Sequence, residues 1–278
     1  MNYLEPIDYQ TPEFGDLYDE LPLWSAPFGL MLLEHVALRP AITILDVGAG
    51  TGFMTIELAQ RCGPDALVIA VDPWAAAMQR LTRKLNHLGI QNVRTLVQSA
   101  AEIDLPDASV DLIVSNLGIN NFDHPEATLQ TCFRLAKPAA SLFLTTNLVG
   151  HMSEFYDAYR SVLLELGLSS QLAALDAHIS HRATVDSVTK RLERAGFKVA
   201  NVVTGSFRER FVDGSALLRH NFIRLAFIPA WKSIAPQEAV EATFTALEHR
   251  LNALAATAGE LSLTIPAACI QAVKPAAM

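Results

Sequence analysis

The order of hydrophobic and polar residues between positions 41 and 147 repeats in a regular way. Short runs that are almost entirely apolar, such as 42–47 and 66–71, alternate with longer segments whose apolar residues recur at helical spacing. Apolar runs without alternation are typical of strands covered on both faces. The pattern therefore predicts a parallel sheet with helices on both faces. The strands are expected at 42–47, 66–71, 93–97, 110–115 and 141–147, and the helices at 52–62, 73–88 and 125–135.

Beyond residue 147 helical periodicity predominates. Helices are expected at 152–166, 171–181, 184–195, 213–227 and 236–256, and further strands at 197–204 and 261–273. We predict a single domain over residues 1–278 whose sheet is completed late in the chain. Its core is expected at about 41–147, 183–206 and 259–275, with a mostly helical cap from 1–30, 148–182 and 207–257 over the carboxyl ends of the strands.

Charge and cysteine content narrow the class of protein. The chain has 278 residues, 51% of them hydrophobic, and a formal net charge of -8. An acidic chain repels phosphate backbones, which argues against a nucleic-acid partner. Cys62, Cys132 and Cys269 are too dispersed for a metal site, and we expect them to be buried in a reducing compartment. With no signal-like or membrane-spanning segment, we expect a soluble cytoplasmic protein without bound metal, with a homodimer left open.

One glycine-rich stretch, residues 45–53, stands between an expected strand and an expected helix. It reads Leu-Asp-Val-Gly-Ala-Gly-Thr-Gly-Phe. Glycines there let the backbone turn sharply and approach a ligand, and the helix N-terminus favours an anionic group. Asp72 ends the next strand, where a carboxylate can accept hydrogen bonds from both ribose hydroxyls. A nicotinamide or flavin site would need glycine at position 53, where Phe53 stands, and a purely structural turn is the remaining alternative.

This region resembles the class I S-adenosylmethionine-dependent methyltransferases. The resemblance covers residues 41–147 and rests on the glycine loop, Asp72, the stretches 99–102 and 105–116, and the turn 134–138. These motifs are most similar to those of the methyltransferases of ubiquinone and menaquinone biosynthesis, a group that includes many metabolite and natural-product enzymes. The resemblance implies S-adenosylmethionine as cofactor and a Rossmann-like, doubly wound α/β sheet of about seven strands with the last strand antiparallel.

The resemblance also implies roles along the cofactor. Backbone groups around Gly48 and Gly50 would hold the methionine part, Asp46 would support the loop or the cofactor amino group, and Asp72 would bind the ribose. The adenine would lie along Pro73 and Trp74. The implied cofactor-binding residues are Asp46, Gly48, Ala49, Gly50, Thr51, Asp72, Pro73, Trp74, Ala100, Ala101, Asn116, Leu117 and Asn121.

The chain departs from the family pattern at two places. Ala100 stands where members often have an aspartate that binds the adenine amino group. Asn120 and Asn121 stand where many members have two histidines, and amides can orient a ligand but not titrate. Neither departure touches the glycine loop.

The acceptor side carries weaker signals, because methyl transfer is an in-line displacement that depends chiefly on alignment. His151 and His220 are the candidate catalytic bases, since His151 follows the expected fifth strand and His220 would share a helix face with Arg224. The candidate substrate residues are Tyr18, Trp24, Tyr156, Arg219 and Arg224. As an alternative, the two arginines could form internal ion pairs with acids such as Glu154, Asp157 or Glu209.

The function expected from these observations is methyl transfer from S-adenosylmethionine to a small, largely apolar metabolite or natural-product acceptor. A protein methyltransferase and a non-methylating descendant that binds the cofactor are the alternatives. The amino-methylating DNA enzymes carry an Asp/Asn-Pro-Pro-aromatic motif after the fourth strand. Here Asn116 is followed by Leu117 and Gly118, so that motif is absent.

Overall fold

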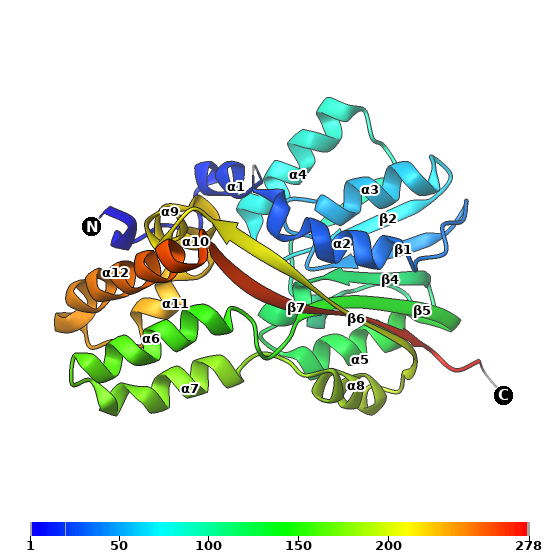
Figure 1. Ribbon diagram of the computed structural model, residues 1–278. Helices are drawn as coiled ribbons and strands as arrows, with labels where there is room; N and C mark the ends of the chain where they lie inside the picture. Colours follow the sequence, from blue (N-terminus) through cyan, green and yellow to red (C-terminus); the bar gives the residue numbers. More distant parts are fainter. Residues whose placement is uncertain (1, 20, 277–278) are drawn as a thin grey trace. The chain divides into compact units, whose positions relative to one another are not determined.

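The computed structural model describes residues 2–19 and 21–276 (Figure 1). Met1 and Glu20, which the predicted cap includes, lie outside the described residues. The described residues form one seven-stranded sheet in the order β3-β2-β1-β4-β5-β7-β6. The strands are β1 Thr43–Val47, β2 Leu67–Val71, β3 Val93–Leu96, β4 Val110–Asn116, β5 Ala136–Asn147, β6 Lys198–Phe211 and β7 Leu261–Val273.

The helices follow the predicted order along the chain. They are α1 Pro12–Asp19, α2 Ala26–Leu33, α3 Phe53–Cys62, α4 Ala75–Leu88, α5 Pro125–Leu135, α6 Ser153–Glu165, α7 Leu172–Ser180, α8 Val185–Arg194, α9 Gly214–Arg219, α10 Asn221–Ala226, α11 Ile228–Lys232 and α12 Val240–Ala258. Helices α3 and α4 lie on one side of the strands, and α5 and α8 lie on the other (Figure 1). None of the helices among the described residues is both long enough and apolar enough to span a membrane.

The direction of the strands confirms the predicted sheet. Strands β1 to β5 pair in parallel. Strand β7 is antiparallel to β5: Ala139 N donates to Lys274 O and Lys274 N donates to Ala140 O, both at 3.0 Å, and Leu148 N donates to Pro266 O at 2.9 Å. Residue numbers rise along one strand as they fall along the other, which is the antiparallel arrangement. The protein therefore has the predicted Rossmann-like α/β fold with an antiparallel last strand.

The chain forms two compact units. The sheet unit comprises Tyr9–Thr146, Thr184–Thr204 and Ala267–Met278. The insertion unit comprises Met1–Asp8, Asn147–Ala183 and Gly205–Pro266. Strands β6 and β7 contribute residues to both units.

The core of the sheet unit is built from the apolar runs that predicted its strands. Ile44 of β1, Val68 of β2 and Val114 of β4 are fully buried, and Met54 and Leu58 of α3 pack against them. Full burial on both faces removes the solvent-facing positions that would otherwise be polar, which is why these strands show no alternation. The three cysteines are all buried and free, as predicted.

The insertion unit is mostly helical and packs around aromatic side chains. Phe155 of α6 stacks on Trp231 of α11 with ring centroids 3.8 Å apart. The Tyr159 hydroxyl donates to the Trp231 carbonyl at 2.9 Å, and the Tyr159 ring lies 6.1 Å from that of Phe244 of α12. These four rings are almost completely buried. Burial of such large apolar surfaces stabilises helices whose individual lengths would be marginal in water.

Some boundaries in the insertion unit differ from the prediction. The helix expected at 213–227 is broken at His220, which has extended backbone angles of φ -63° and ψ 128° between α9 and α10. Its start is as expected, because the Asp213 side chain accepts a hydrogen bond from Ala216 N at 2.8 Å. Strand β6 continues to Phe211, seven residues past the expected end at 204. Neither glycine nor proline marks the break at His220, so local sequence gave no signal of it.

Candidate functional site

The glycine loop after β1 has the backbone geometry that its sequence predicts. Gly48, Gly50 and Gly52 have φ angles of +77°, +53° and +91°, a region that other residues rarely adopt. A Cβ at Gly52 would lie 2.2 Å from Leu81 Cδ1, so this position also needs glycine for close packing. At Gly50 a Cβ would meet no atom within 4 Å. The loop therefore leaves open space at Gly50, where a ligand can approach the backbone.

Asp72 at the end of β2 holds this loop in place. Its Oδ2 accepts a hydrogen bond from Gly50 N at 2.9 Å, and its Oδ1 accepts one from Trp74 N at 2.8 Å. Each carboxylate oxygen keeps a second lone pair, which can accept a hydrogen bond from a ribose hydroxyl. Burial raises the pKa of Asp72, and the two backbone hydrogen bonds oppose that rise.

Asp46 lies buried at the base of the loop, in strand β1. Its Oδ2 accepts a hydrogen bond from Thr55 Oγ1 of α3 at 2.6 Å. Burial raises the pKa of Asp46 to about 7, and the nearby charge of Asp72 adds to the rise. A cationic group bound nearby would favour the ionised carboxylate. Sequence reasoning did not find Thr55, because its pairing with Asp46 depends on how α3 packs on β1.

Aromatic side chains from the N-terminal segment gather beside Trp74. Trp74 Nε1 donates to the Tyr9 carbonyl at 2.9 Å, and the Trp74 ring meets those of Tyr18 and Phe14 at centroid distances of 5.3 and 5.4 Å. Burial and the charge of Asp72 both raise the pKa of Tyr18. The structure thus brings Tyr18, which was predicted to face the substrate, close to the residues predicted for the cofactor. Trp24 instead packs on Phe28, with centroids 5.9 Å apart.

Ion pairs hold helix α1 against helix α4. Arg80 Nε lies 2.8 Å from Asp19 Oδ2, and Lys84 pairs with the same carboxylate. A Cβ at Gly15 would lie 3.0 Å from the carbonyl oxygen of Ala76, so the two helices approach each other closely there. These contacts fix α1 next to the start of α4, where Asp72 and the loop lie.

The carboxyl end of β4 adds Asn116 and Leu117 to the site. Asn116 Oδ1 accepts a hydrogen bond from Thr145 Oγ1 at 2.7 Å, and Asn116 Nδ2 donates to the Ser25 carbonyl at 3.1 Å. Leu117 has a φ of +65°, an unfavourable conformation for a side chain with a Cβ. A Cβ at Gly118 would lie 2.7 Å from the Val47 carbonyl, so the ends of β4 and β1 are in close contact. Backbone strain of this kind is typical of functional sites.

The remaining residues predicted for the cofactor lie around these strand ends. Ala100 is buried and Ala101 half-buried in a short 3₁₀ turn, Ala100–Glu102. Ala101 N donates to Ser99 Oγ at 3.3 Å, and Ala101 O accepts from Thr131 Oγ1 at 2.9 Å. Asn121 is exposed at the end of a second 3₁₀ turn, Gly118–Asn121. Ala49 and Thr51 are buried within the loop, and Pro73 is exposed beside it.

His151 and Tyr156 belong to the insertion unit. His151 is 2% exposed, and its ring stacks on that of Phe227 with centroids 5.5 Å apart. Burial lowers the pKa of His151 well below its usual value, and the charges of Arg182 and His178 lower it further. The imidazole is therefore neutral at pH 7 and able to accept a proton. The Tyr156 hydroxyl lies 3.1 Å from His178 Nε2.

The other candidates of the insertion unit are not brought together as predicted. Arg219 lies 2.6 Å from Glu248, and its side chain is 49% exposed. Arg219 therefore forms an ion pair, with Glu248 rather than with one of the acids suggested by the sequence. His220 is exposed between α9 and α10, so it does not share one helix with Arg224. Arg224 Nε is buried and has no hydrogen-bond partner among the described residues.

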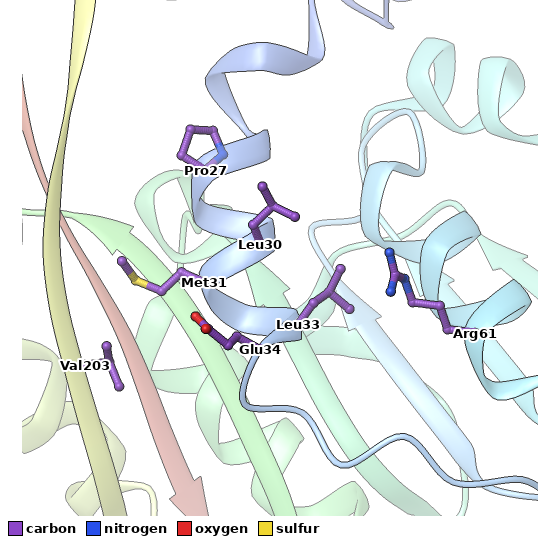
Figure 2. Close-up of a pocket in the computed structure, with 7 residues that line it drawn as sticks. All are labelled: Pro27, Leu30, Met31, Leu33, Glu34, Arg61 and Val203. Carbon is purple, nitrogen blue, oxygen red and sulfur yellow. The ribbon is translucent and has the colours of Figure 1, made fainter.

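A surface groove of about 590 Å³ lies along helix α2 of the sheet unit (Figure 2). It is lined by Pro27, Leu30, Met31, Leu33, Glu34, Arg61 and Val203. None of the predicted site residues lines it. The groove is mostly apolar, whereas a nucleotide-like cofactor needs several placed donors and acceptors. The lining of this groove therefore does not fit a nucleotide-like cofactor. No group of three or more potential metal ligands occurs among the residues that the structure describes.

Comparison with known proteins finds methyltransferases among the similar proteins. A family model described as a methyltransferase domain matches residues 44–139. The chain is 29% identical over 172 residues to the ubiquinone/menaquinone biosynthesis C-methyltransferase UbiE of Salmonella arizonae, a match that covers 60% of this chain and 67% of that protein. These matches support a class I S-adenosylmethionine-dependent methyltransferase. For a second UbiE protein, from Salmonella paratyphi B, the match covers 62% of its length, so about a third of these relatives lies outside it.

Solved structures show the same fold. A methyltransferase from Aquifex aeolicus matches with a TM-score of 0.54 and 24% identity, covering 69% of this chain and 92% of that one. A phosphoethanolamine N-methyltransferase from Haemonchus contortus, solved with S-adenosylhomocysteine, matches with a TM-score of 0.56 and 15% identity, covering 98% of this chain and 61% of that one. The cofactor of this methyltransferase is S-adenosylmethionine. The loop, Asp46 and Asp72 supply the open backbone and carboxylates that this cofactor requires.

Proposed function

We propose that this methyltransferase transfers a methyl group from S-adenosylmethionine to a small, largely apolar metabolite or natural-product acceptor. The observation that carries the proposal is the link between Gly50 N and Asp72 Oδ2 at 2.9 Å, beside open space at Gly50. A donor-rich backbone next to a carboxylate with free lone pairs suits a charged amino acid joined to a nucleoside. The names of the relatives add support, because UbiE and the phosphoethanolamine enzyme both act on small molecules.

In this proposal, the residues predicted for the cofactor contact different parts of it. Gly48 and Gly50 approach the methionine part through their backbones, Asp46 offers a negative charge to its amino group, and Asp72 accepts hydrogen bonds from the ribose. Trp74 lies along the adenine. When bound, the cofactor supplies an electrophilic methyl group on a sulfonium. The remaining residues of the proposed set are Ala49, Thr51, Pro73, Ala100, Ala101, Asn116, Leu117 and Asn121.

The proposed base on the acceptor side is His151. Its low pKa keeps the imidazole neutral, so it can accept a proton from a hydroxyl or amine of the acceptor. Burial and the Phe227 ring hold the imidazole in one orientation. His220 is the second candidate, and burial lowers its pKa as well, although its position is exposed. Tyr156 provides a buried hydroxyl on the neighbouring helix α6.

The test uses methyl-labelled S-adenosylmethionine and a cell metabolite extract that has been freed of protein. We expect labelled small molecules and stoichiometric S-adenosylhomocysteine. Asp72→Ala should lose the reaction, and Asp65→Ala, at an exposed acid outside the site, should keep it. Label that enters protein only would contradict the small-molecule proposal. Cofactor binding without S-adenosylhomocysteine production from either source would instead identify a non-methylating descendant.

A further inference from the structure

The stretch between β3 and β4 is held against helix α5 of the sheet unit by two side chains of that helix. Thr131 Oγ1 donates to the Ala101 carbonyl at 2.9 Å. One turn later, Arg134 Nη2 donates to the Ile103 carbonyl at 2.7 Å, and Arg134 Nη1 donates to the Leu105 carbonyl at 2.9 Å. Residues three apart lie on the same face of a helix. One face of α5 therefore holds three backbone carbonyls of this stretch.

Side-chain burial and the backbone of α5 fix the same stretch further. The side chains of Ile103 and Leu105 are buried, so the middle of the stretch is anchored in the core. Near its end, Ala108 N donates to the Arg134 carbonyl at 3.1 Å. Each of these contacts joins the stretch to α5 or to the core, and none depends on the insertion unit. The position of the stretch is therefore set within the sheet unit.

The beginning of this stretch lies at the edge of the sheet where Asp72 lies. Asp72 N, at the end of β2, donates to the Leu96 carbonyl at the end of β3, at 3.2 Å. The 3₁₀ turn Ala100–Glu102 follows shortly after Leu96. Because β2 and β3 are parallel, the turn leaves the sheet at its carboxyl edge, beside the end of β2. A ribose bound to Asp72 would carry its base toward this turn.

The two alanines of the turn can recognise a base only through their backbones. Ala100 and Ala101 are among the residues that the proposed function assigns to the cofactor, and their side chains are methyl groups without a donor or acceptor. Any hydrogen bond from them to the base therefore comes from a backbone N–H or carbonyl. Hydrogen bonds weaken steeply when donor and acceptor are misaligned. Recognition of the base therefore depends on the side chains that hold this backbone in place, Thr131 and Arg134.

We propose that Thr131 and Arg134 are positioning residues for the adenine of S-adenosylmethionine and determine the selectivity for that base. The proposal rests on the proposed function, because it concerns the cofactor of the same reaction. In it neither residue contacts the base: Thr131 acts through the carbonyl of Ala101, and Arg134 acts through the next part of the stretch. A guanidinium suits this role because it presents several donors in a fixed plane and stays charged. Its ion pair with Asp107 is secondary, since that carboxylate is 74% exposed.

The test compares the binding of S-adenosylhomocysteine and S-inosylhomocysteine by calorimetry. In the second ligand an oxygen replaces the amino group of the base, so a donor becomes an acceptor while the ribose and the amino acid stay the same. We expect the wild type to bind S-adenosylhomocysteine about tenfold or more tightly. In Thr131→Val and in Arg134→Gln this ratio of affinities should fall by roughly threefold or more. Thr131→Ser and Arg134→Lys retain a donor and should keep more of the ratio.

The ratio separates positioning from a general loss of stability, because partial unfolding weakens the binding of both ligands alike. Asp107→Ala is the matched control. It removes the ion pair of Arg134 and leaves the hydrogen bonds of Arg134 to the Ile103 and Leu105 carbonyls, so it should keep the wild-type ratio. Thermal unfolding of each variant shows whether the fold persists, and Thr131→Val decides the test if Arg134→Gln does not fold.

Three results would overturn the proposal. They are equal binding of the two ligands by the wild type, a wild-type ratio in the folded Thr131→Val and Arg134→Gln variants, and an equal loss of the ratio in Asp107→Ala. Each of them leaves the proposed function in place as long as the wild type binds S-adenosylhomocysteine. A wild type that binds neither ligand would instead contradict the proposed function, and this inference with it.

Discussion

Replacement of Asp72 is the perturbation whose effect the structure defines best. Its carboxylate joins the glycine loop to the start of α4 through Gly50 N and Trp74 N, at 2.9 and 2.8 Å. In the proposed complex the same two oxygens accept hydrogen bonds from the ribose. Asp72→Ala removes both kinds of contact, whereas Asp72→Asn keeps one acceptor oxygen and the shape of the side chain. The two variants therefore separate the loss of charge from the loss of the link.

The expected magnitude follows from the number and kind of hydrogen bonds. A hydrogen bond to a charged group contributes about 1.5–3 kcal/mol. Loss of one such bond to the ribose should weaken cofactor binding roughly 10- to 150-fold. Asp72→Ala should weaken it further, because the Gly50 backbone is no longer held in its binding conformation. Asp72→Asn should lie between Asp72→Ala and the wild type.

The assay is calorimetric titration with S-adenosylhomocysteine. Thermal unfolding of each variant without ligand shows whether the fold persists, and Asp65→Ala controls for the loss of one surface carboxylate. Wild-type affinity in Asp72→Ala, with the fold intact, would refute the assignment of Asp72 to the ribose. An equal loss in Asp65→Ala would show that net charge rather than position governs binding.

Three further predictions concern single residues. Gly50→Ala places a Cβ at φ +53°, which should cost about 1–2 kcal/mol of folding free energy. The same Cβ should reduce the affinity for S-adenosylhomocysteine, measured by titration, by more than Asp65→Ala does. Burial raises the pKa of Asp46 from 3.8 to about 7, so the folded protein holds a proton there that the unfolded chain releases. The contribution of Asp46 to folding stability should therefore fall as the pH rises from 3.8 to about 7. Denaturant titrations of Asp46→Asn should show a smaller fall over this pH range. Trp231 is fully buried, and Trp231→Ala should cost about 3–5 kcal/mol in the same denaturant assay; a loss below 1 kcal/mol would contradict its place in the core.

The sheet could be predicted from sequence because its strands are buried on both faces. The run at 42–47 became β1 Thr43–Val47, and the run at 261–273 became β7 with the same bounds. The Thr184 N-cap before α8 was also predicted, and its side chain accepts a hydrogen bond from Ser187 N at 3.0 Å. In these segments local preference and tertiary packing favour the same structure.

The break at His220 and the contact of Tyr156 with His178 could not be predicted in the same way. The stretch 213–227 is apolar throughout, so it fits one continuous helix as well as two short ones. The contact of Tyr156 with His178 joins residues 22 positions apart on two helices. Such pairings arise from tertiary structure, which no local pattern encodes.

The most direct test of the central claim is a calorimetric comparison of S-adenosylhomocysteine with NAD on the wild-type protein. Both ligands carry an adenosine, so a site that recognised only the adenosine would bind both. The loop lacks a glycine at position 53 and places Asp46 beneath it. We predict low-micromolar or tighter binding of S-adenosylhomocysteine, roughly -8 kcal/mol, and no measurable binding of NAD. Binding of NAD without binding of S-adenosylhomocysteine would contradict the account.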